Sequence, residues 1–224
     1  MCGRFSLYRL EGIIERFRVK KTTFQIIPSY NIAPSHEIFA IDSNNQLIKL
    51  KWGLIPFWTK ERTLKKTIIN ARAESVDKKP AFKNSFKYKR CLIPADGFYE
   101  WKAEGKRKVP YRISLKNNEL FGFAGLWDSW KAPSGKVINT CAIITTAANS
   151  LVKPIHNRMP VILPREAENI WLNPSLTDSQ VLNNLLIPYP AELMKAYKIS
   201  DLVNSPSNNT PKIVEAIAES YFSC

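Results

Sequence analysis

The chain has 224 residues, 45% of them hydrophobic and 23% charged, a balance typical of a globular protein and more consistent with one domain over residues 1–224 than with two. It has no run of about 18 apolar residues, which excludes a membrane-spanning helix, and its amino terminus lacks the apolar stretch of a secretory signal. We therefore expect a cytoplasmic protein. The net charge of +14 favours nucleic acid over a membrane surface as the partner.

Apolar spacing and turn residues predict helices towards the two ends of the chain and strands between them. A first helix is predicted over residues 9–17, followed by hairpins over residues 37–42 with 46–52 and 98–103 with 110–115. Further strands are predicted over residues 120–125 and 137–145, and helices over 164–172, 177–186 and 211–220. We therefore expect an α+β fold: a single domain with a central mixed or antiparallel β-sheet, curved and barrel-like, flanked by helices.

The cysteines and histidines do not form a metal-binding pattern. The four cysteines are scattered without a C-x-x-C pair, and the only histidines are His36 and His156. A disulfide framework is not expected in a reducing cytosol. We therefore expect no metal and no cofactor, and we interpret His36 as a structural histidine.

Cys2 is the cysteine whose position suggests chemistry. Removal of Met1 would leave an amino-terminal cysteine, with an amine and a thiol on adjacent carbons. The pKa of an α-amino group lies near 8, against about 10.4 for lysine, so more of it is neutral and nucleophilic at pH 7. Such an aminothiol condenses with an aldehyde to an imine, and the thiol then closes a thiazolidine ring. A residue so near the end could equally belong to a disordered terminus.

A series of short motifs bears on this choice. In chain order they are MCGRF at residues 1–5, NIAP at 31–34, WGLIP at 52–56, NARAE at 70–74, RCLIPA at 90–95, GFYEW at 97–101, FAGLW at 123–127, TTAAN at 145–149 and IHNRMP at 155–160. Together they resemble the SRAP family of SOS-response-associated peptidases, or abasic-site-processing proteins. The resemblance covers about residues 2–164, with a looser similarity at Val203-Asn204, and residues 165–224 are expected to complete the fold.

The resemblance implies a lyase-like protein that senses abasic sites in single-stranded DNA. After Met1 removal, Cys2 would bond to the deoxyribose C1′ as a thiazolidine, which shields the lesion from strand cleavage. His156 is the expected acid that opens the closed sugar, because its pKa lies nearest neutral among the side chains. Glu100 is the expected base that takes a proton from the amine, and Asn70 is expected to hydrogen-bond the sugar and the forming ring. Met1 would be removed by an autopeptidase activity of the protein or by a housekeeping aminopeptidase, and reversal of the crosslink is also expected.

The expected DNA contacts form two groups. Three arginines, each close in sequence to an expected catalytic residue, would bind phosphates: Arg4, Arg72 and Arg158. An apolar platform for flanking bases would come from Pro34, Phe57 and Trp58. Trp101 and Trp127 are predicted to belong to the core. The expected partner is single-stranded DNA containing abasic sites, bound by a monomer that is associated with the nucleoid.

Two alternatives remain open. A thiol peptidase with an amino-terminal nucleophile could use Cys2, His156 and Glu100, and turnover of a peptide panel would reveal it. A non-covalent reader of modified bases in DNA would need the basic surface and the aromatic platform but not Cys2. Replacement of Cys2 by alanine would leave the binding of such a reader undiminished.

Overall fold

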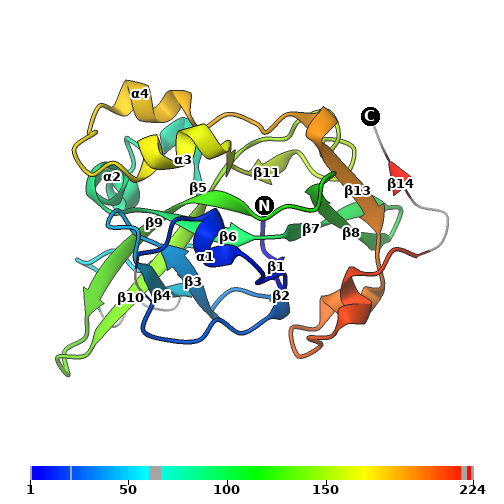
Figure 1. The fold of residues 1–224 in the computed structure, drawn as a ribbon, viewed down its shortest axis with the longest axis horizontal. Coiled ribbons are helices and arrows are strands. Elements are labelled where there is room, and N and C mark those ends of the chain that lie inside the picture. Colours follow the sequence, from blue (N-terminus) through cyan, green and yellow to red (C-terminus); the bar gives the residue numbers. More distant parts are fainter. Residues whose placement is uncertain (1, 21, 61–66, 218–220, 223–224) are drawn as a thin grey trace.

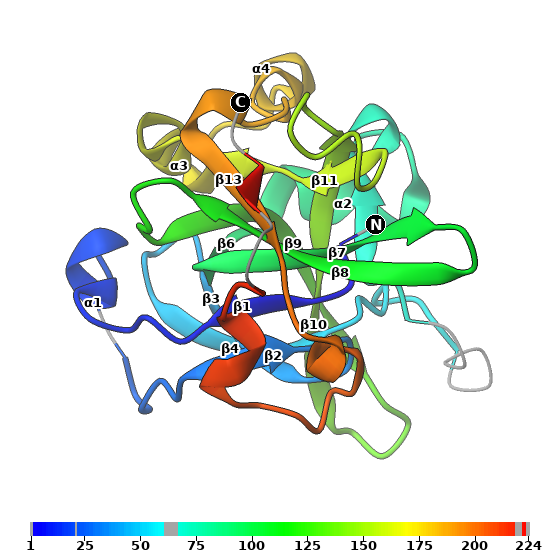
Figure 2. The same ribbon diagram turned by 90° about the vertical axis from the view of Figure 1, so that its right-hand side faces the viewer.

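The computed structural model describes residues 2–20, 22–60, 67–217 and 221–222, and the strands within them form two sheets. The first sheet has the strand order β14 (Tyr221–Phe222), β13 (Met194–Lys198), β8 (Arg107–Leu115), β7 (Gly97–Glu104), β1 (Phe5–Leu7) and β2 (Ser29–Ile32). All its pairings are antiparallel. The first strand of the chain therefore lies inside this sheet, between β7 and β2 (Figure 2).

The second sheet closes on itself. Its ring consists of β10 (Val137–Ala147), β4 (Leu47–Trp52), β3 (Glu37–Ile41), β6 (Arg90–Ala95) and β9 (Phe121–Lys131), which pairs back to β10. Short strands extend it at β5 (Asn70–Arg72) and β11 (Arg158–Pro160) beside β10, and at β12 (Ile162–Leu163) beside β9. β10 runs parallel to β4 and β5 but antiparallel to β9 and β11. The prediction of an α+β fold with a mixed, curved and barrel-like sheet is confirmed.

Side chains fill the interior of this barrel, and Gly125 makes room for them. Every residue of β6 is buried, and Gly125 of β9 lies opposite Cys91 of β6. A Cβ atom at Gly125 would lie 2.8 Å from Sγ of Cys91 and 2.9 Å from Cδ1 of Ile93, closer than real Cβ atoms approach. The barrel is therefore a packed core rather than a channel.

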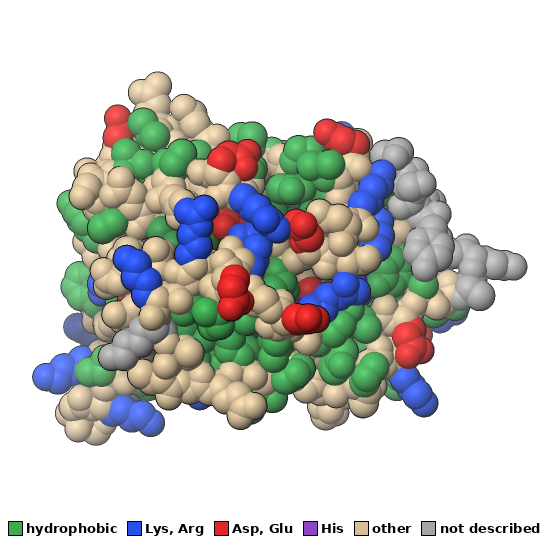
Figure 3. All heavy atoms as spheres, viewed as in Figure 1, with side chains coloured by type: hydrophobic (Ala, Val, Ile, Leu, Met, Phe, Trp, Pro, Cys, Tyr) green, Lys and Arg blue, Asp and Glu red, His purple; other side chains and the backbone are tan. Residues whose placement is uncertain are grey.

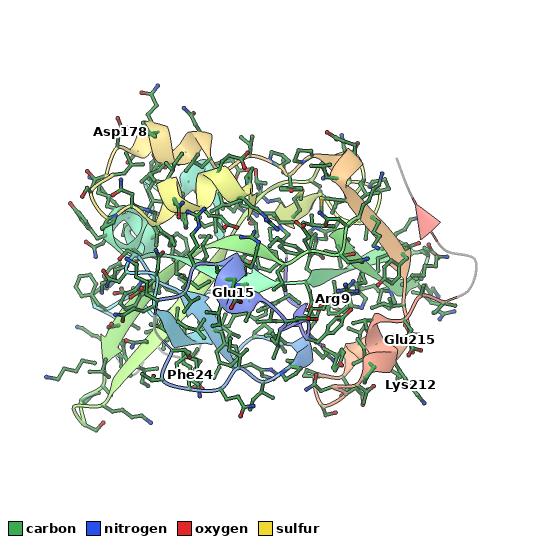
Figure 4. The ribbon with its side chains drawn as sticks, in the orientation of Figure 1. Arg9, Glu15, Phe24, Asp178, Lys212 and Glu215 are labelled. Atoms are coloured by element: carbon green, nitrogen blue, oxygen red, sulfur yellow. The ribbon has the colours of Figure 1, made fainter. Side chains whose placement is uncertain are left out.

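Helices α2 (Pro80–Tyr88), α3 (Arg165–Leu172) and α4 (Ser179–Asn184) gather on one side of the barrel, whereas α1 (Ile13–Arg16) is a single turn (Figure 1). Phe86 of α2 packs against Trp171 of α3, with ring centroids 5.9 Å apart. Asp178 accepts hydrogen bonds from two backbone N–H groups of the first turn of α4, at whose start it lies (Figure 4). None of the described helices has the length and apolarity needed to cross a membrane.

Arg90 joins the ends of α2 and α3. It is 3% exposed, and its guanidinium N–H groups donate to five backbone carbonyl oxygens, at 2.6–2.9 Å, of Phe86, Lys87, Trp171, Asn173 and Leu176. A cation near the last carbonyls of a helix interacts favourably with the helix dipole. One side chain thus completes the carboxyl ends of two helices at once.

Most predicted elements are confirmed, and two are wrong in extent. Both hairpins are present, as are the helices predicted over residues 164–172 and 177–186, although α4 is shorter. The predicted helix over residues 9–17 is reduced to α1 because Gly12, at φ 67°, adopts a left-handed conformation that prevents an earlier start. In place of the helix predicted over residues 211–220, the described residues contain only the 3-10 turn η5 (Pro211–Val214), and residues 218–220 lie outside them.

The two sheets meet at the first strand. The ring of Phe5 in β1 lies 5.3 Å from that of Trp52 in β4 and 5.7 Å from that of Phe123 in β9. Phe5 itself pairs with Phe98 of β7. β1 is therefore held from both sides, and the residues before it are directed along β7.

Candidate active site

A pocket of about 500 Å³ lies beside β7. Its lining residues are Glu100, Trp101, Lys108, His156 and Asn204. They come from β7, from β8, from the turn before β11 and from the 3-10 turn η4 (Asp201–Asn204). Two of the four expected catalytic residues, Glu100 and His156, therefore share one pocket that only the fold assembles.

Cys2 lies at the end of the strand pairing between β1 and β7. The N–H of Tyr99 donates to the carbonyl oxygen of Arg4 at 3.0 Å, which extends the ladder beyond Phe5. Residues 2–4 thus run alongside residues 99–101, and Cys2 is fully buried. Burial, and next the negative charge of Glu100, raise the pKa of the Cys2 thiol far above its ordinary value. The thiol therefore stays protonated at neutral pH.

Asn70 holds the backbone of Cys2. Its Nδ2 donates to the carbonyl oxygen of Cys2 at 2.8 Å. The position follows from β5, which pairs with β10 so that Ala71 faces the core while Asn70 and Arg72 face the other way. Oδ1 of Asn70 is buried and has no hydrogen-bond partner among the described residues. This oxygen can accept a hydrogen bond from a ligand.

Glu100 is 3% exposed and lies in the middle of β7. Burial disfavours the charged form and raises the pKa of its carboxyl from 4.5 to about 7. The strand alternates as expected: Phe98, two residues before Glu100, belongs to the main core cluster, whereas Tyr99 and Trp101 pack in a separate cluster. At neutral pH the Glu100 carboxyl therefore exchanges between its acid and base forms.

The pKa of His156 is shifted in the opposite direction to that of Glu100. Burial, as the largest cause, lowers the pKa of its imidazole, so the ring is neutral at pH 7. Its Nδ1 lies 3.0 Å from the backbone nitrogen and 3.2 Å from the carbonyl oxygen of Arg158, so the backbone of Arg158 holds the ring. In the neutral tautomer whose Nδ1–H donates to that carbonyl oxygen, Nε2 carries no proton and can accept one.

The three arginines expected to bind phosphates differ in what they contact. Nη1 of Arg4 donates to Oδ1 of Asn31 at 2.7 Å and to the carbonyl oxygen of Val203 at 2.6 Å. Arg158 forms a bidentate ion pair with Glu74. Arg72 is exposed. Their binding to phosphate stays a prediction.

The expected aromatic platform lies outside the residues that line the pocket. Phe57 and Trp58 are 55% and 48% exposed, and their rings meet edge to face at 4.9 Å. The N–H of Phe57 donates to Oδ2 of Asp128 at 2.9 Å, which fixes the loop. Pro34 is half-buried and likewise outside the pocket lining. Stacking of bases on these residues stays a prediction.

The pocket also contains residues that sequence reasoning missed. Trp101, predicted to be core, is half-buried: it packs against a small core cluster that includes Val203, and it also lines the pocket. Its Nε1 donates to Oδ1 of Asn204 at 2.7 Å, and the guanidinium carbon of Arg4 lies 6.0 Å from the ring centroid. Lys108 completes the rim. The similarity at Val203-Asn204 was the available signal for the carboxyl-terminal contribution.

Within the residues that the structure describes, no group of three or more His, Cys, Asp or Glu side chains could hold a metal ion. Cys2, Cys91 and Cys141 are buried free thiols. Nδ1 of His36 accepts from the N–H of Ala33 at 3.4 Å, in keeping with a structural role.

Comparisons with known proteins agree with the motif series. Residues 1–206 match the family described as SOS response associated peptidase (SRAP), an extent that goes beyond the motifs and includes Val203-Asn204. The chain is 50% identical to the abasic site processing protein YoqW of Bacillus subtilis, over 96% of this chain and 100% of the relative. It is 32% identical to the abasic site processing protein HMCES of Xenopus tropicalis, over 85% of this chain and 66% of the relative.

Solved structures share the fold. A crystal structure of a protein from Bacteroides thetaiotaomicron superposes with a TM-score of 0.89 at 32% identity, covering 96% of this chain and 100% of the other. A protein from Bordetella bronchiseptica gives a TM-score of 0.78 at 25% identity, covering 89% of this chain and 100% of the other. The family match over residues 1–206 and the 50% identity to YoqW lead to one conclusion: the chain belongs to the SOS response associated peptidase (SRAP) family.

Proposed function

We propose that this protein processes abasic sites in single-stranded DNA by capturing them covalently through Cys2 after removal of Met1. The observation that carries the proposal is the hydrogen bond from Asn70 to the Cys2 carbonyl, which holds the amino-terminal end beside buried Glu100 and its pocket. The relatives named abasic site processing proteins support the choice of substrate. The net charge of +14 supports a DNA ligand.

The opposite pKa shifts of Glu100 and His156 support an order of proton transfers in the opening of the closed sugar. Neutral His156 accepts the proton of the sugar's anomeric hydroxyl, while protonated Glu100 donates to the ring oxygen, and the free aldehyde results. In this ring-opening step His156 is the base rather than the acid expected from the sequence, and Glu100 supplies the proton. The pKa directions favour this assignment, because the pKa of Glu100 is raised and that of His156 is lowered.

Glu100 and His156 then transfer protons in the condensation of the Cys2 amine with the aldehyde. Ionised Glu100 takes a proton from the Cys2 amine as its nitrogen bonds to C1′, and protonated His156 gives its proton to the aldehyde oxygen, which becomes a hydroxyl. Glu100 then passes its proton to this hydroxyl, which leaves as water. His156 takes the second proton of the nitrogen, and the neutral imine results. The thiol finally adds to the imine carbon, and its proton goes to the nitrogen, giving the neutral thiazolidine. The raised pKa of the thiol supports this order, with the amine first and the sulfur second.

The thiol pKa also bears on the peptidase alternative. A peptidase requires the thiolate as nucleophile, and reactive cysteines have a lowered pKa. The thiol of Cys2 has a raised one. Covalent capture, which begins at the amine, has no such requirement.

The test is incubation with a single-stranded oligonucleotide carrying one abasic site, followed by a denaturing gel and intact-mass measurement. The expected product survives boiling and lacks the mass of Met1. Cys2→Ala keeps the amine but loses the thiol, so its imine should survive the gel only after borohydride reduction. Cys91→Ala, which removes a buried thiol from the barrel, is the matched control and should form the adduct. Absence of an adduct, with Met1 shown to be removed, would refute the proposal.

A further inference from the structure

An ion pair spans β10 next to the pocket. Glu74 belongs to η2 (Ala73–Ser75), directly after β5, and Arg158 begins β11. β5 and β11 pair with the two opposite edges of β10. Both carboxylate oxygens of Glu74 accept from the guanidinium of Arg158, one from Nη1 and the other from Nη2 at 3.0 Å.

The two partners of this pair are held very differently. The Arg158 side chain is 16% exposed, and its Nη2 also donates to the carbonyl oxygen of Thr145 at 2.6 Å. The Glu74 side chain is 54% exposed. The arginine is thus fixed by the barrel, whereas the carboxylate reaches it from the solvent side. An ion pair with such an exposed partner contributes little to stability and is readily exchanged.

Two of the arginines expected to bind phosphate, Arg158 and Arg72, act electrostatically on Glu74. The hydrogen bond from Arg158, and further the positive charges of Arg158 and Arg72, lower the pKa of the Glu74 carboxyl. The carboxylate is therefore ionised at neutral pH and offsets one of the two positive charges. Arg72 precedes it by two residues and is exposed.

A carboxylate and a phosphate present the same bidentate geometry to a guanidinium. The Nη1 and Nη2 groups that face Glu74 therefore cannot bind a DNA phosphate in the same way until the carboxylate leaves. When an undamaged strand binds here, a contact between its phosphate and Arg158 replaces the contact between Glu74 and Arg158. Because the two contacts are similar, the net gain in binding free energy is only the difference between them. A strand held by the pocket as well has additional binding energy with which to displace Glu74.

We propose that Glu74 is a specificity-determining residue that occupies the phosphate position on Arg158 in the DNA-free protein and so weakens binding to undamaged strands. The inference rests on the proposed function only in naming single-stranded DNA as the ligand. It does not depend on the covalent step.

The test is equilibrium binding of undamaged single-stranded DNA, measured by fluorescence anisotropy over a range of salt concentrations. Glu74→Gln should bind about threefold to tenfold more tightly than wild type, and the plot of log affinity against log salt should steepen by about 0.7, the value for one more phosphate contact. Adding Arg158→Gln to Glu74→Gln should return the slope to that of wild type.

Glu119→Gln is the matched control. Glu119 is 48% exposed and accepts from Nη2 of Arg165 at 2.8 Å, so its replacement changes the net charge equally. Arg165 begins α3, and the face over α1 and α3 carries intermixed basic and acidic side chains (Figure 3). This variant should not steepen the salt dependence.

Two results would overturn the inference. In the first, Glu74→Gln binds no more tightly than Glu119→Gln. In the second, Glu74→Gln binds more weakly than wild type, which would assign the ion pair to holding β5 and β11 together. Failure of the proposed function gives a different signature: no adduct on abasic DNA, with the binding of undamaged DNA unaffected.

Discussion

Replacement of Glu100 by glutamine should stabilise the folded protein at alkaline pH, even though it removes an expected catalytic group. Burial raises the pKa of this carboxyl from 4.5 to about 7. Because this pKa is higher in the folded state than in the unfolded state, Glu100 contributes to the free energy of unfolding as long as it is protonated. This contribution is fully present below about pH 4.5 and is lost as the pH rises through about 7. Glutamine retains the shape of the carboxyl without its charge.

The magnitude follows from linkage. One pH unit of pKa difference corresponds to about 1.4 kcal/mol, so ionisation of Glu100 inside the fold costs about 3 kcal/mol. Between about pH 5 and about pH 8.5, the free energy of unfolding of Glu100→Gln should therefore rise by about 2–3 kcal/mol relative to that of wild type. The difference between the two proteins removes the contributions of all other titrating groups.

Urea unfolding at the two pH values, monitored by tryptophan fluorescence, measures this difference. Glu192→Gln, at an exposed position, serves as the control and should follow wild type at both pH values. If the stability difference between Glu100→Gln and wild type were the same at both pH values, the reasoning from burial would be refuted.

Three other substitutions test the site and its support. Asn70→Ala removes the bond to the Cys2 carbonyl and should slow adduct formation at saturating abasic DNA about tenfold, which gel quantification over time would measure. Asn204→Leu removes the bond to Nε1 of Trp101 and should raise the DNA concentration for half-maximal adduct rate several-fold, with little change in the urea midpoint. Arg90→Leu leaves five carbonyl oxygens without their donor and should lower the free energy of unfolding by about 3–5 kcal/mol in urea titrations.

Each of these has a control and a contradicting result. Asn44→Ala, in the exposed turn between β3 and β4, should form the adduct at the wild-type rate. A wild-type rate in Asn70→Ala would contradict the role of its hydrogen bond. An unchanged DNA dependence in Asn204→Leu would restrict Asn204 to the fold, and stability loss below 1 kcal/mol in Arg90→Leu would contradict the helix-joining role.

The strands were predictable where local signals were strong. The hairpin of β3 and β4 has alternating apolar residues around an Asn-rich turn, and the structure retains it with little change. α2 was missed because its lysines and asparagine obscure the spacing of Phe82 and Phe86, the apolar pair that faces the core. β13 was missed because Met-Lys-Ala-Tyr-Lys has no strong strand preference; its pairing with β8 decides its structure.

The site was predictable only as a set of motifs. Resemblance identified Glu100 and His156, which line the pocket, and Asn70, which contacts Cys2. Partners from the carboxyl-terminal segment were not predictable, because the contact between Trp101 and Asn204 joins residues 103 positions apart. No local pattern encodes such a contact.

The hydrogen bond from Arg4 to the Val203 carbonyl has a consequence for biosynthesis. It joins residues 199 positions apart, and the ribosome adds about 5–20 residues per second, so the two partners are made about 10–40 s apart. During that interval Arg4 lacks its contact with η4, and the contribution of Asn204 to the pocket is missing. An aminopeptidase could reach Met1 in the nascent chain, before the pocket exists. The pocket, whose lining includes Asn204, is complete only once the carboxyl-terminal segment has been made.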